Sequence, residues 1–173
     1  MRKHFVIVVG SLLAATPVLA QAPADSPITQ PVLDIMPFDI PYGTPITLAT
    51  AHKALAAAEA EAAKHNWKLV CAVAEPTGDL IAFDKMDGAQ YASIQIAPEK
   101  ARAAARFRRA TKVFADAVNK NGTIGTLGIP GAITAEGGFP IVVGGKLVGA
   151  IGCSGAIGNQ DATAAWAGVD AVK

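Results

Sequence analysis

The sequence predicts an α+β fold, in which helices pack on a central antiparallel sheet and an extended proline-rich arm precedes the domain. Two observations carry this prediction. From residue 47 the chain reads as one helix, two strands, two helices, two or three strands and a last helix, with no internal repeat. Both groups of strands also contain the short turn sequences typical of antiparallel hairpins.

The clearest predicted helix covers residues 47–67. Thr47 is suited to cap it, because its hydroxyl can accept a hydrogen bond from a free backbone N–H of the first turn. Apolar residues recur at steps of three and four along one stripe, at Leu48, Ala51, Leu55, Ala58 and Ala62. Since this stripe is mostly alanine, we expect the helix to lie close to the surface it covers.

Three more helices are predicted further along the chain. The first spans residues 98–109, where Pro98 suits the opening turn of a helix. A shorter helix follows Thr111, a candidate cap, over residues 112–118. The last helix begins at Asp161, whose carboxylate complements a helix start. Residues 119–131 are expected to form a loop with one short strand.

Two hairpins supply the strands of the predicted sheet. Residues 69–74 and 80–83 are apolar runs on either side of the turn sequence Pro-Thr-Gly-Asp. Residues 141–143 and 146–148 flank Gly144 and Gly145, a pair typical of two-residue turns with positive φ at both centres. Both turns are short enough to make the neighbouring strands antiparallel.

Glycine is concentrated between residues 136 and 155, which raises the question of a phosphate-binding loop. Such a loop leads from a strand through its glycines into a helix. Here the glycines occupy a turn and then recur inside an apolar strand, at Gly149, Gly152 and Gly155, and neither GxGxxG nor a P-loop pattern occurs. We therefore predict that these positions let a helix or a flat ligand approach the backbone closely.

The first twenty residues have the three parts of a secretory signal peptide: a basic start, a short apolar run and small residues up to Ala20. An uncleaved membrane anchor is the alternative, but the apolar run is too short to span a bilayer. Residues 21–46 are rich in proline and are predicted to form the extended arm, which leaves residues 47–173 as one domain. We expect a periplasmic or secreted protein with no stable membrane insertion after cleavage.

The charge of the chain argues against a nucleic-acid partner. The formal net charge is +1, and loss of Arg2 and Lys3 with the signal peptide would leave 13 basic and 14 acidic residues. A nearly neutral protein offers no general attraction to nucleic acid or to acidic lipid.

The chain has two cysteines, Cys71 and Cys153, and both lie in apolar, strand-like runs. In an oxidising compartment they could form a disulfide. They could equally remain as buried thiols, because a buried free cysteine behaves as a small hydrophobic residue. The sequence leaves both alternatives open.

Two long stretches resemble a known family. The sequences "MDGAQYASIQIAPEKARAAARFRRAT" and "GIPGAITAEGGFPIVVGGKLVGAIGCSGAIGNQDATAAWAG" are similar to the GlcG/HbpS-like family, which includes the C-terminal domain of PduO-type proteins and is described as haem-binding or haem-degrading. The resemblance covers roughly residues 47–173. Ala110 and the pair Glu75-Pro76 depart from the family pattern.

The resemblance implies a profilin-like α/β/α sandwich with a central antiparallel sheet of about five strands. It also implies homo-oligomers, from dimer to octamer, and non-covalent binding of haem or another tetrapyrrole. An activity does not follow from a shared fold, so the residues have to carry the functional argument.

Histidine is the first candidate for an iron ligand, because haem iron most often takes a nitrogen or sulfur ligand. His52 and His65 remain after loss of the signal peptide, and His52 is the predicted metal ligand. The alternatives are a surface histidine at position 52 and a helix-terminal cation at position 65. Met86 is a second possible ligand, although such a methionine is more often part of the core. No HExxH, CxxC or CxxCH motif is present, which argues against structural zinc and covalent haem.

Six cations lie between residues 100 and 112: Lys100, Arg102, Arg106, Arg108, Arg109 and Lys112. Arginine forms a planar fork that suits carboxylates, including the propionates of haem. Arg102 and Arg106 are four residues apart on one helix face and are the predicted cofactor-binding pair. The alternative is a solvated helix face.

Glu136 is the predicted catalytic acid or base, and Gly137 and Gly138 beside it are predicted to let a ligand come near the backbone. The alternative is that Glu136 only caps the loop. Ser154 is not in a nucleophile elbow, and Cys153 lies in an apolar strand where burial raises a thiol pKa, so neither residue is predicted to act as a nucleophile.

Three functions follow from these features. The first is an exported haem- or tetrapyrrole-binding protein that supports haem degradation or uptake. The second is an accessory protein or enzyme acting on a small organic acid or redox cofactor, with Glu136, Arg102 and Arg106 as its polar site. The third is a structural oligomer without a small ligand.

Overall fold

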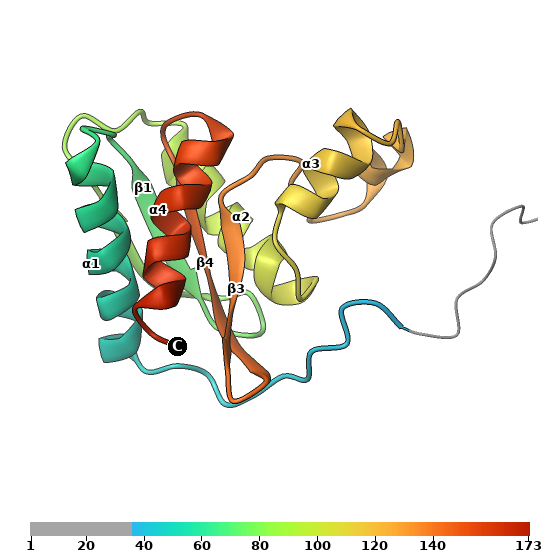
Figure 1. Ribbon diagram of the computed structural model, residues 1–173, viewed down its shortest axis with the longest axis horizontal. Helices are drawn as coiled ribbons and strands as arrows, with labels where there is room; N and C mark the ends of the chain where they lie inside the picture. The colour runs from blue at the N-terminus through green and yellow to red at the C-terminus, as the bar shows by residue number, and fades with distance from the viewer. Residues whose placement is uncertain (1–35) are drawn as a thin grey trace, which may run out of the picture. The chain divides into compact units, whose positions relative to one another are not determined.

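The computed structural model describes residues 36–173, in which four strands form one antiparallel sheet (Figure 1). The strands are β1 (Val70–Ala74), β2 (Leu80–Lys85), β3 (Gly138–Val143) and β4 (Lys146–Ser154), in the order β2-β1-β4-β3. The α+β class is confirmed, with four strands where about five were expected. The predicted signal peptide and residues 21–35 of the arm lie outside the described residues.

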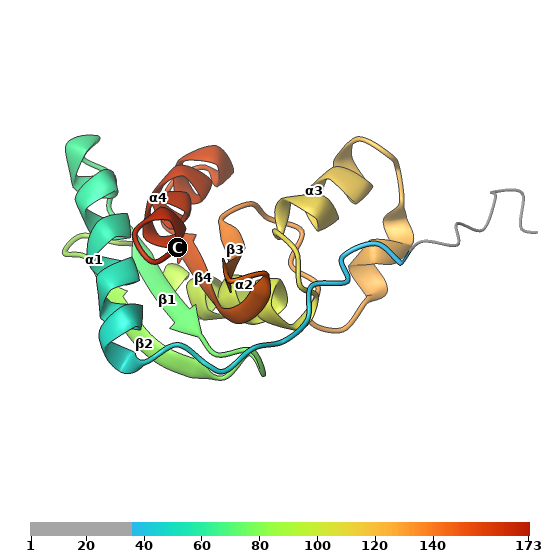
Figure 2. The ribbon, with the colours of Figure 1, turned by 60° about the horizontal axis from the view of Figure 1, so that its bottom comes forward.

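Part of the arm takes the place of a further strand. Beyond the end of β1, the N–H of Gly43 donates to the carbonyl of Leu147 at 2.7 Å, and the N–H of Leu147 donates to the carbonyl of Pro41 at 2.8 Å. These bonds form a parallel bridge between Tyr42 and Leu147. Figures 1 and 2 show this segment running past the β3–β4 hairpin.

Helices α1 (Leu48–Lys64) and α4 (Gly158–Asp170) cover one face of the sheet, and α2 (Ser93–Arg106) covers the other (Figure 2). As predicted, the Thr47 hydroxyl accepts a hydrogen bond from the N–H of Thr50, at 3.2 Å. The predicted alanine-rich stripe of α1 is buried except for Leu48, which is exposed. Between residues 36 and 173, no helix combines the length and apolar character needed to cross a bilayer.

Helix α2 begins five residues before the predicted start, so Pro98 lies inside the helix and not in its opening turn. The early turn forms because Ser93 and Ala97 are both buried against the sheet. A proline at this depth removes one helical hydrogen bond, and the packing of the first turn outweighs that loss.

Helix α3 (Lys112–Asn119) is confirmed, but Thr111 does not cap it: the Thr111 hydroxyl accepts from the N–H of Gly138 at 3.0 Å. The short strand predicted after α3 is wrong, because that segment contains the 3₁₀ helix η1 (Ile124–Gly128). Helix α3 and η1 project beyond the end of the sheet (Figures 1 and 2).

The glycine-rich stretch is a hairpin that supports a helix. Gly144 and Gly145 have φ values of 56° and 76°, which confirms the two-residue turn. At Gly152, a side chain would collide with the backbone of α2 at Ala97 and Ala101. The close approach predicted here is therefore made by helix α2, which leaves no room for a flat ligand at this position.

Candidate functional site

The six cations of residues 100–112 do not form one patch. Most have a partner of their own: Lys100 pairs with Asp161, Arg102 with Glu99, Arg108 with Asp39, and Lys112 with Asp116 and Glu136. The Arg109 guanidinium lies 3.8 Å from the centre of the Phe38 ring. The predicted basic surface is thus divided among several local contacts.

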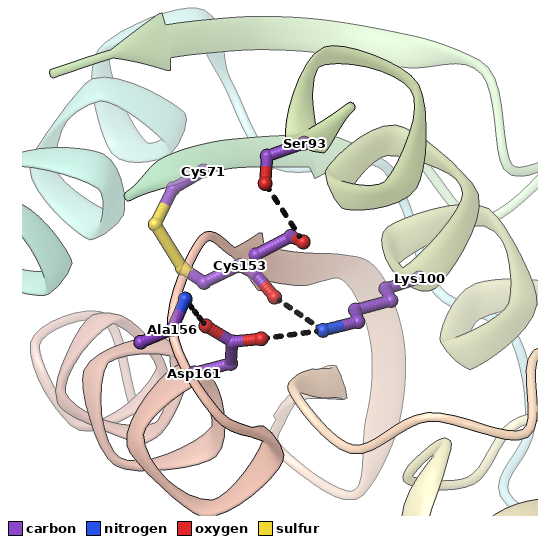
Figure 3. Close-up of a disulfide and its surroundings, with 7 residues drawn as sticks. Cys71, Ser93, Lys100, Cys153, Ala156 and Asp161 are labelled. Atoms are coloured by element: carbon purple, nitrogen blue, oxygen red, sulfur yellow. Dashed lines mark hydrogen bonds and ion pairs between the residues drawn. A yellow bond between two sulfur atoms is a disulfide. The ribbon is translucent and has the colours of Figure 1, made fainter. Parts of the chain in front are cut away.

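Lys100 is enclosed within the domain (Figure 3). Its Nζ donates to the Asp161 carboxylate at 2.8 Å and to the carbonyl of Cys153 at 2.9 Å, and both ionic side chains are at most 4% exposed. The other Asp161 oxygen accepts from the N–H of Ala156 at 3.0 Å. Asp161 is therefore more than a helix-start carboxylate, because it joins the start of α4 to α2 and to the end of β4.

Burial dominates the protonation of Asp161. Loss of hydration raises the pKa of its carboxyl, while the hydrogen bond from Lys100 and the backbone N–H groups offset part of that rise. The polar atoms of both side chains have hydrogen-bond partners within the protein. Its role is to hold three elements together.

The two cysteines form a disulfide beside this pair (Figure 3). Cys71 on β1 is directly opposite Cys153 on β4, with the two Cα atoms 4.2 Å apart. Both residues are buried, so the bridge is inside the core between the sheet and helices α1 and α4. Of the two alternatives that the sequence left open, the structure has the disulfide.

Arg102 and Arg106, the predicted cofactor-binding pair, both lie against the turn between β1 and β2. Gly78 in that turn has a φ of 89°, and a Cβ there would lie 2.8 Å from Cγ of Arg102 and 2.7 Å from Nε of Arg106. Glycine thus lets the turn rest on the two arginine stems. Arg106 also donates from Nε to the carbonyl of Thr77, at 2.7 Å.

An open pocket of about 400 Å³ lies at this turn and is lined by Tyr42, Pro76, Thr77 and Arg106. Tyr42 belongs to the arm, and its hydroxyl donates to the carbonyl of Arg106 at 3.0 Å. Pockets of this size and type are usual places for small ligands. The pocket therefore combines an arginine from α2 with walls from two other segments.

The arm is held in place by the two arginines that follow α2. Arg108 donates to the carbonyl of Ile40 at 3.2 Å and to the carboxylate of Asp39 at 3.4 Å. Arg109 stacks over Phe38. Burial and the neighbouring Arg108 lower the pKa of the Arg109 guanidinium. These contacts fix the position of Tyr42 over the pocket.

The predicted catalytic Glu136 is not in the pocket. Its carboxylate accepts from Nζ of Lys112 at 2.8 Å, and its side chain packs near Gly158 at the start of α4. A Cβ on Gly137 would lie 2.8 Å from Cβ of Asp161, and one on Gly138 would lie 2.6 Å from Cγ2 of Thr111. Protein atoms, and not space for a ligand, surround these two glycines.

The histidines lie apart from the arginines. His52 is exposed on α1, and His65 stacks on Trp67 with ring centres 4.4 Å apart and contacts Glu61.

Met86 packs against the core, which was the alternative to its prediction as an iron ligand. Across residues 36–173, no three His, Cys, Asp or Glu side chains gather to hold a metal ion. His52 and Arg106 are on helices that cover opposite faces of the sheet.

Sequence reasoning missed Tyr42 and Thr77 as pocket residues. Tyr42 lies in the proline-rich arm, 64 residues from Arg106 in the chain, so no local pattern links them. The sequence did draw attention to Pro76, because the pair Glu75-Pro76 departs from the family pattern at this turn.

Comparisons with known proteins agree on one family. The family model described as "Haem degrading protein HbpS-like" matches residues 46–170. Protein GlcG of Escherichia coli K12 is 43% identical over 100 residues, which cover 58% of this chain and 74% of GlcG.

Solved structures have the same fold. HbpS of Streptomyces reticuli, solved as a double mutant, has a TM-score of 0.68 and 30% identity, covering 85% of this chain and 99% of HbpS. The PduOC–haem complex has a TM-score of 0.68 at 23% identity, covering 75% of this chain and 96% of PduOC, and at that identity it supports the fold alone. Because the family model spans nearly the whole domain, this chain belongs to the HbpS-like family.

Proposed function

We propose that the protein is an exported haem- or tetrapyrrole-binding protein that holds its ligand without a covalent bond. The observation that carries the proposal is the match of residues 46–170 to the HbpS-like family. PduOC, a protein of the same fold, has been solved in complex with haem. The signal-peptide pattern of residues 1–20 supports a periplasmic or secreted location.

His52 is the proposed iron ligand. Its ring is exposed on α1, whereas His65 is engaged with Trp67 and Glu61. A histidine nitrogen suits haem iron, and when bound the haem would supply redox chemistry that the side chains lack. Because one face of an exposed helix cannot enclose a macrocycle, we propose that a second copy of the chain covers the other side of the haem.

Absorbance titration with hemin tests the proposal. We expect a stoichiometric shift of the Soret band with the wild-type protein, and loss of the iron–histidine spectrum in His52→Ala. The matched control is His65→Ala, in which the spectrum should remain. Absence of a Soret shift at a one-to-one ratio would contradict haem binding, and an unchanged spectrum in His52→Ala would exclude His52 alone.

Haem degradation is a further activity that the same samples test. After addition of a reductant in air, a protein that degrades haem should lose the Soret band faster than a solution of free hemin. An equal rate in both solutions would restrict the function to binding.

A further inference from the structure

Arg106 differs from the other cations of its segment in having no charge-compensating partner among residues 36–173. The neighbouring cations pair with carboxylates or, for Arg109, with an aromatic ring. Arg106 makes one side-chain hydrogen bond in this part of the chain, from Nε to the neutral carbonyl of Thr77. The two terminal nitrogens of its guanidinium have no protein acceptor there.

The guanidinium is nevertheless held in one direction. The bond to Thr77 fixes Nε, and the hydroxyl of Tyr42 anchors the backbone of Arg106 at 3.0 Å. The carboxylate of Asp79, in the same turn, accepts from the hydroxyl of Thr77 at 2.9 Å and forms no ion pair with Arg106. A fixed guanidinium with free terminal nitrogens is suited to a carboxylate, which it binds through two parallel hydrogen bonds.

The rest of the pocket indicates what the carboxylate is attached to. The ring of Tyr42 is half exposed, and the ring of Pro76 forms another wall. These are apolar surfaces beside a single charged group. A volume of about 400 Å³ is enough for a small aromatic or aliphatic group.

We propose that this pocket binds a carboxylate attached to an apolar body, with Arg106 as the anchor and Tyr42 and Pro76 as the walls. The carboxylate has two possible sources, a free organic acid or a propionate of haem. Only the second source rests on the proposed function.

Benzoate and benzamide test the free-acid source, because they share a shape and differ in charge. Binding is followed at constant pH and ionic strength by the NMR shifts of the Thr77 and Gly78 amides. We expect benzoate to bind at least 10-fold more tightly than benzamide, and this preference to disappear in Arg106→Gln. The matched control is Lys53→Gln, an equal loss of charge on the exposed surface of α1, and it should keep the preference.

Haem and haem dimethyl ester test the second source, because the ester has no free propionate. A propionate at Arg106 predicts that esterification weakens Soret-monitored binding at least 10-fold in the wild type and not in Arg106→Gln. Equal binding of haem and its ester, together with a benzoate preference, supports the free acid.

The proposal is overturned if neither carboxylate is preferred over its neutral counterpart, or if Arg106→Gln retains the preference. If Arg106→Gln does not fold, the two comparisons on the wild-type protein still decide it. A protein that binds benzoate but not haem contradicts the proposed function and leaves the carboxylate site standing.

Discussion

Lys100 and Arg106 are cations of the same helix, six residues apart, and the fold uses them in opposite ways. Lys100 is 2% exposed and has both a carboxylate and a carbonyl as acceptors. Arg106 is exposed at the end of α2, with a pocket before it and no carboxylate partner in the described chain. Position along the helix relative to the sheet separates the two roles.

The comparison shows which positive charges of this protein are available to a ligand. A buried charge must be compensated within the fold, because its desolvation is expensive. Lys100 is therefore committed to Asp161 and cannot also hold a ligand. An exposed arginine has no such demand, so its free nitrogens remain available.

Replacement of Lys100 should have the largest effect on the stability of the protein. In Lys100→Met, Asp161 loses its cation and is left buried, so we expect a loss of about 3–5 kcal/mol in the free energy of unfolding. Urea denaturation with the disulfide intact measures it. Arg106→Gln is the control, and its exposed site predicts a change within about 0.5 kcal/mol. Equal effects of the two substitutions would refute the assignment of a structural role to Lys100.

Removal of the disulfide should be the next largest effect, and it acts on the Lys100 end of the helix. The bridge joins residues that are 82 apart in the chain, so it restricts the unfolded state strongly. The double variant Cys71→Ala/Cys153→Ala should lose about 2–4 kcal/mol of stability. Under conditions in which the double variant is folded, we expect it to bind benzoate as the wild type does. Loss of benzoate binding by the folded variant would show that the disulfide also determines the structure at the Arg106 end of α2.

Gly78→Ala should affect both stability and ligand binding at the Arg106 end of α2. The substitution forces a side chain into a left-handed backbone and against the two arginine stems, at an expected cost of about 1–3 kcal/mol. It should also displace the Arg106 guanidinium and weaken benzoate binding. Gly144→Ala is the matched control, since its φ is also positive but no atom lies near the new Cβ. Gly144→Ala should lower the free energy of unfolding and leave benzoate binding unchanged.

The pH dependence of stability that arises from the buried Lys100–Asp161 pair should be the smallest effect. Because burial raises the pKa of Asp161 above its usual 3.8, the folded state holds that proton more tightly than the unfolded state. The resulting stabilisation is present below the unfolded pKa and is lost as pH rises through the folded pKa. We expect the stability of the wild type relative to Asp161→Asn to fall as pH increases above about 4. Paired urea titrations measure this difference, and a rise with pH would show that Lys100 outweighs burial.

Local patterns predicted the elements better than they predicted the site. The cap at Thr47, the alanine stripe and the Gly144-Gly145 turn depend on neighbours in the chain, and each was found where the sequence placed it. The predicted start of α2 was wrong. Pro98 indicated a helix start at residue 98, whereas the packing of Ser93 and Ala97 starts the helix five residues earlier. The adjacency of Arg102 and Arg106 was also a local prediction, since four residues make one helical turn.

Local sequence patterns were enough to predict the α+β class, the hairpins, the resemblance to the family and the exclusion of a phosphate loop, because each depends on residues close together in the chain. The three-dimensional structure was needed to establish that the cysteines are bonded, that Lys100 is buried while Arg106 remains free, and that Tyr42 completes a pocket. Those outcomes depend on contacts between distant segments. The periodicity of one segment carries no information about which cation will meet a carboxylate from another.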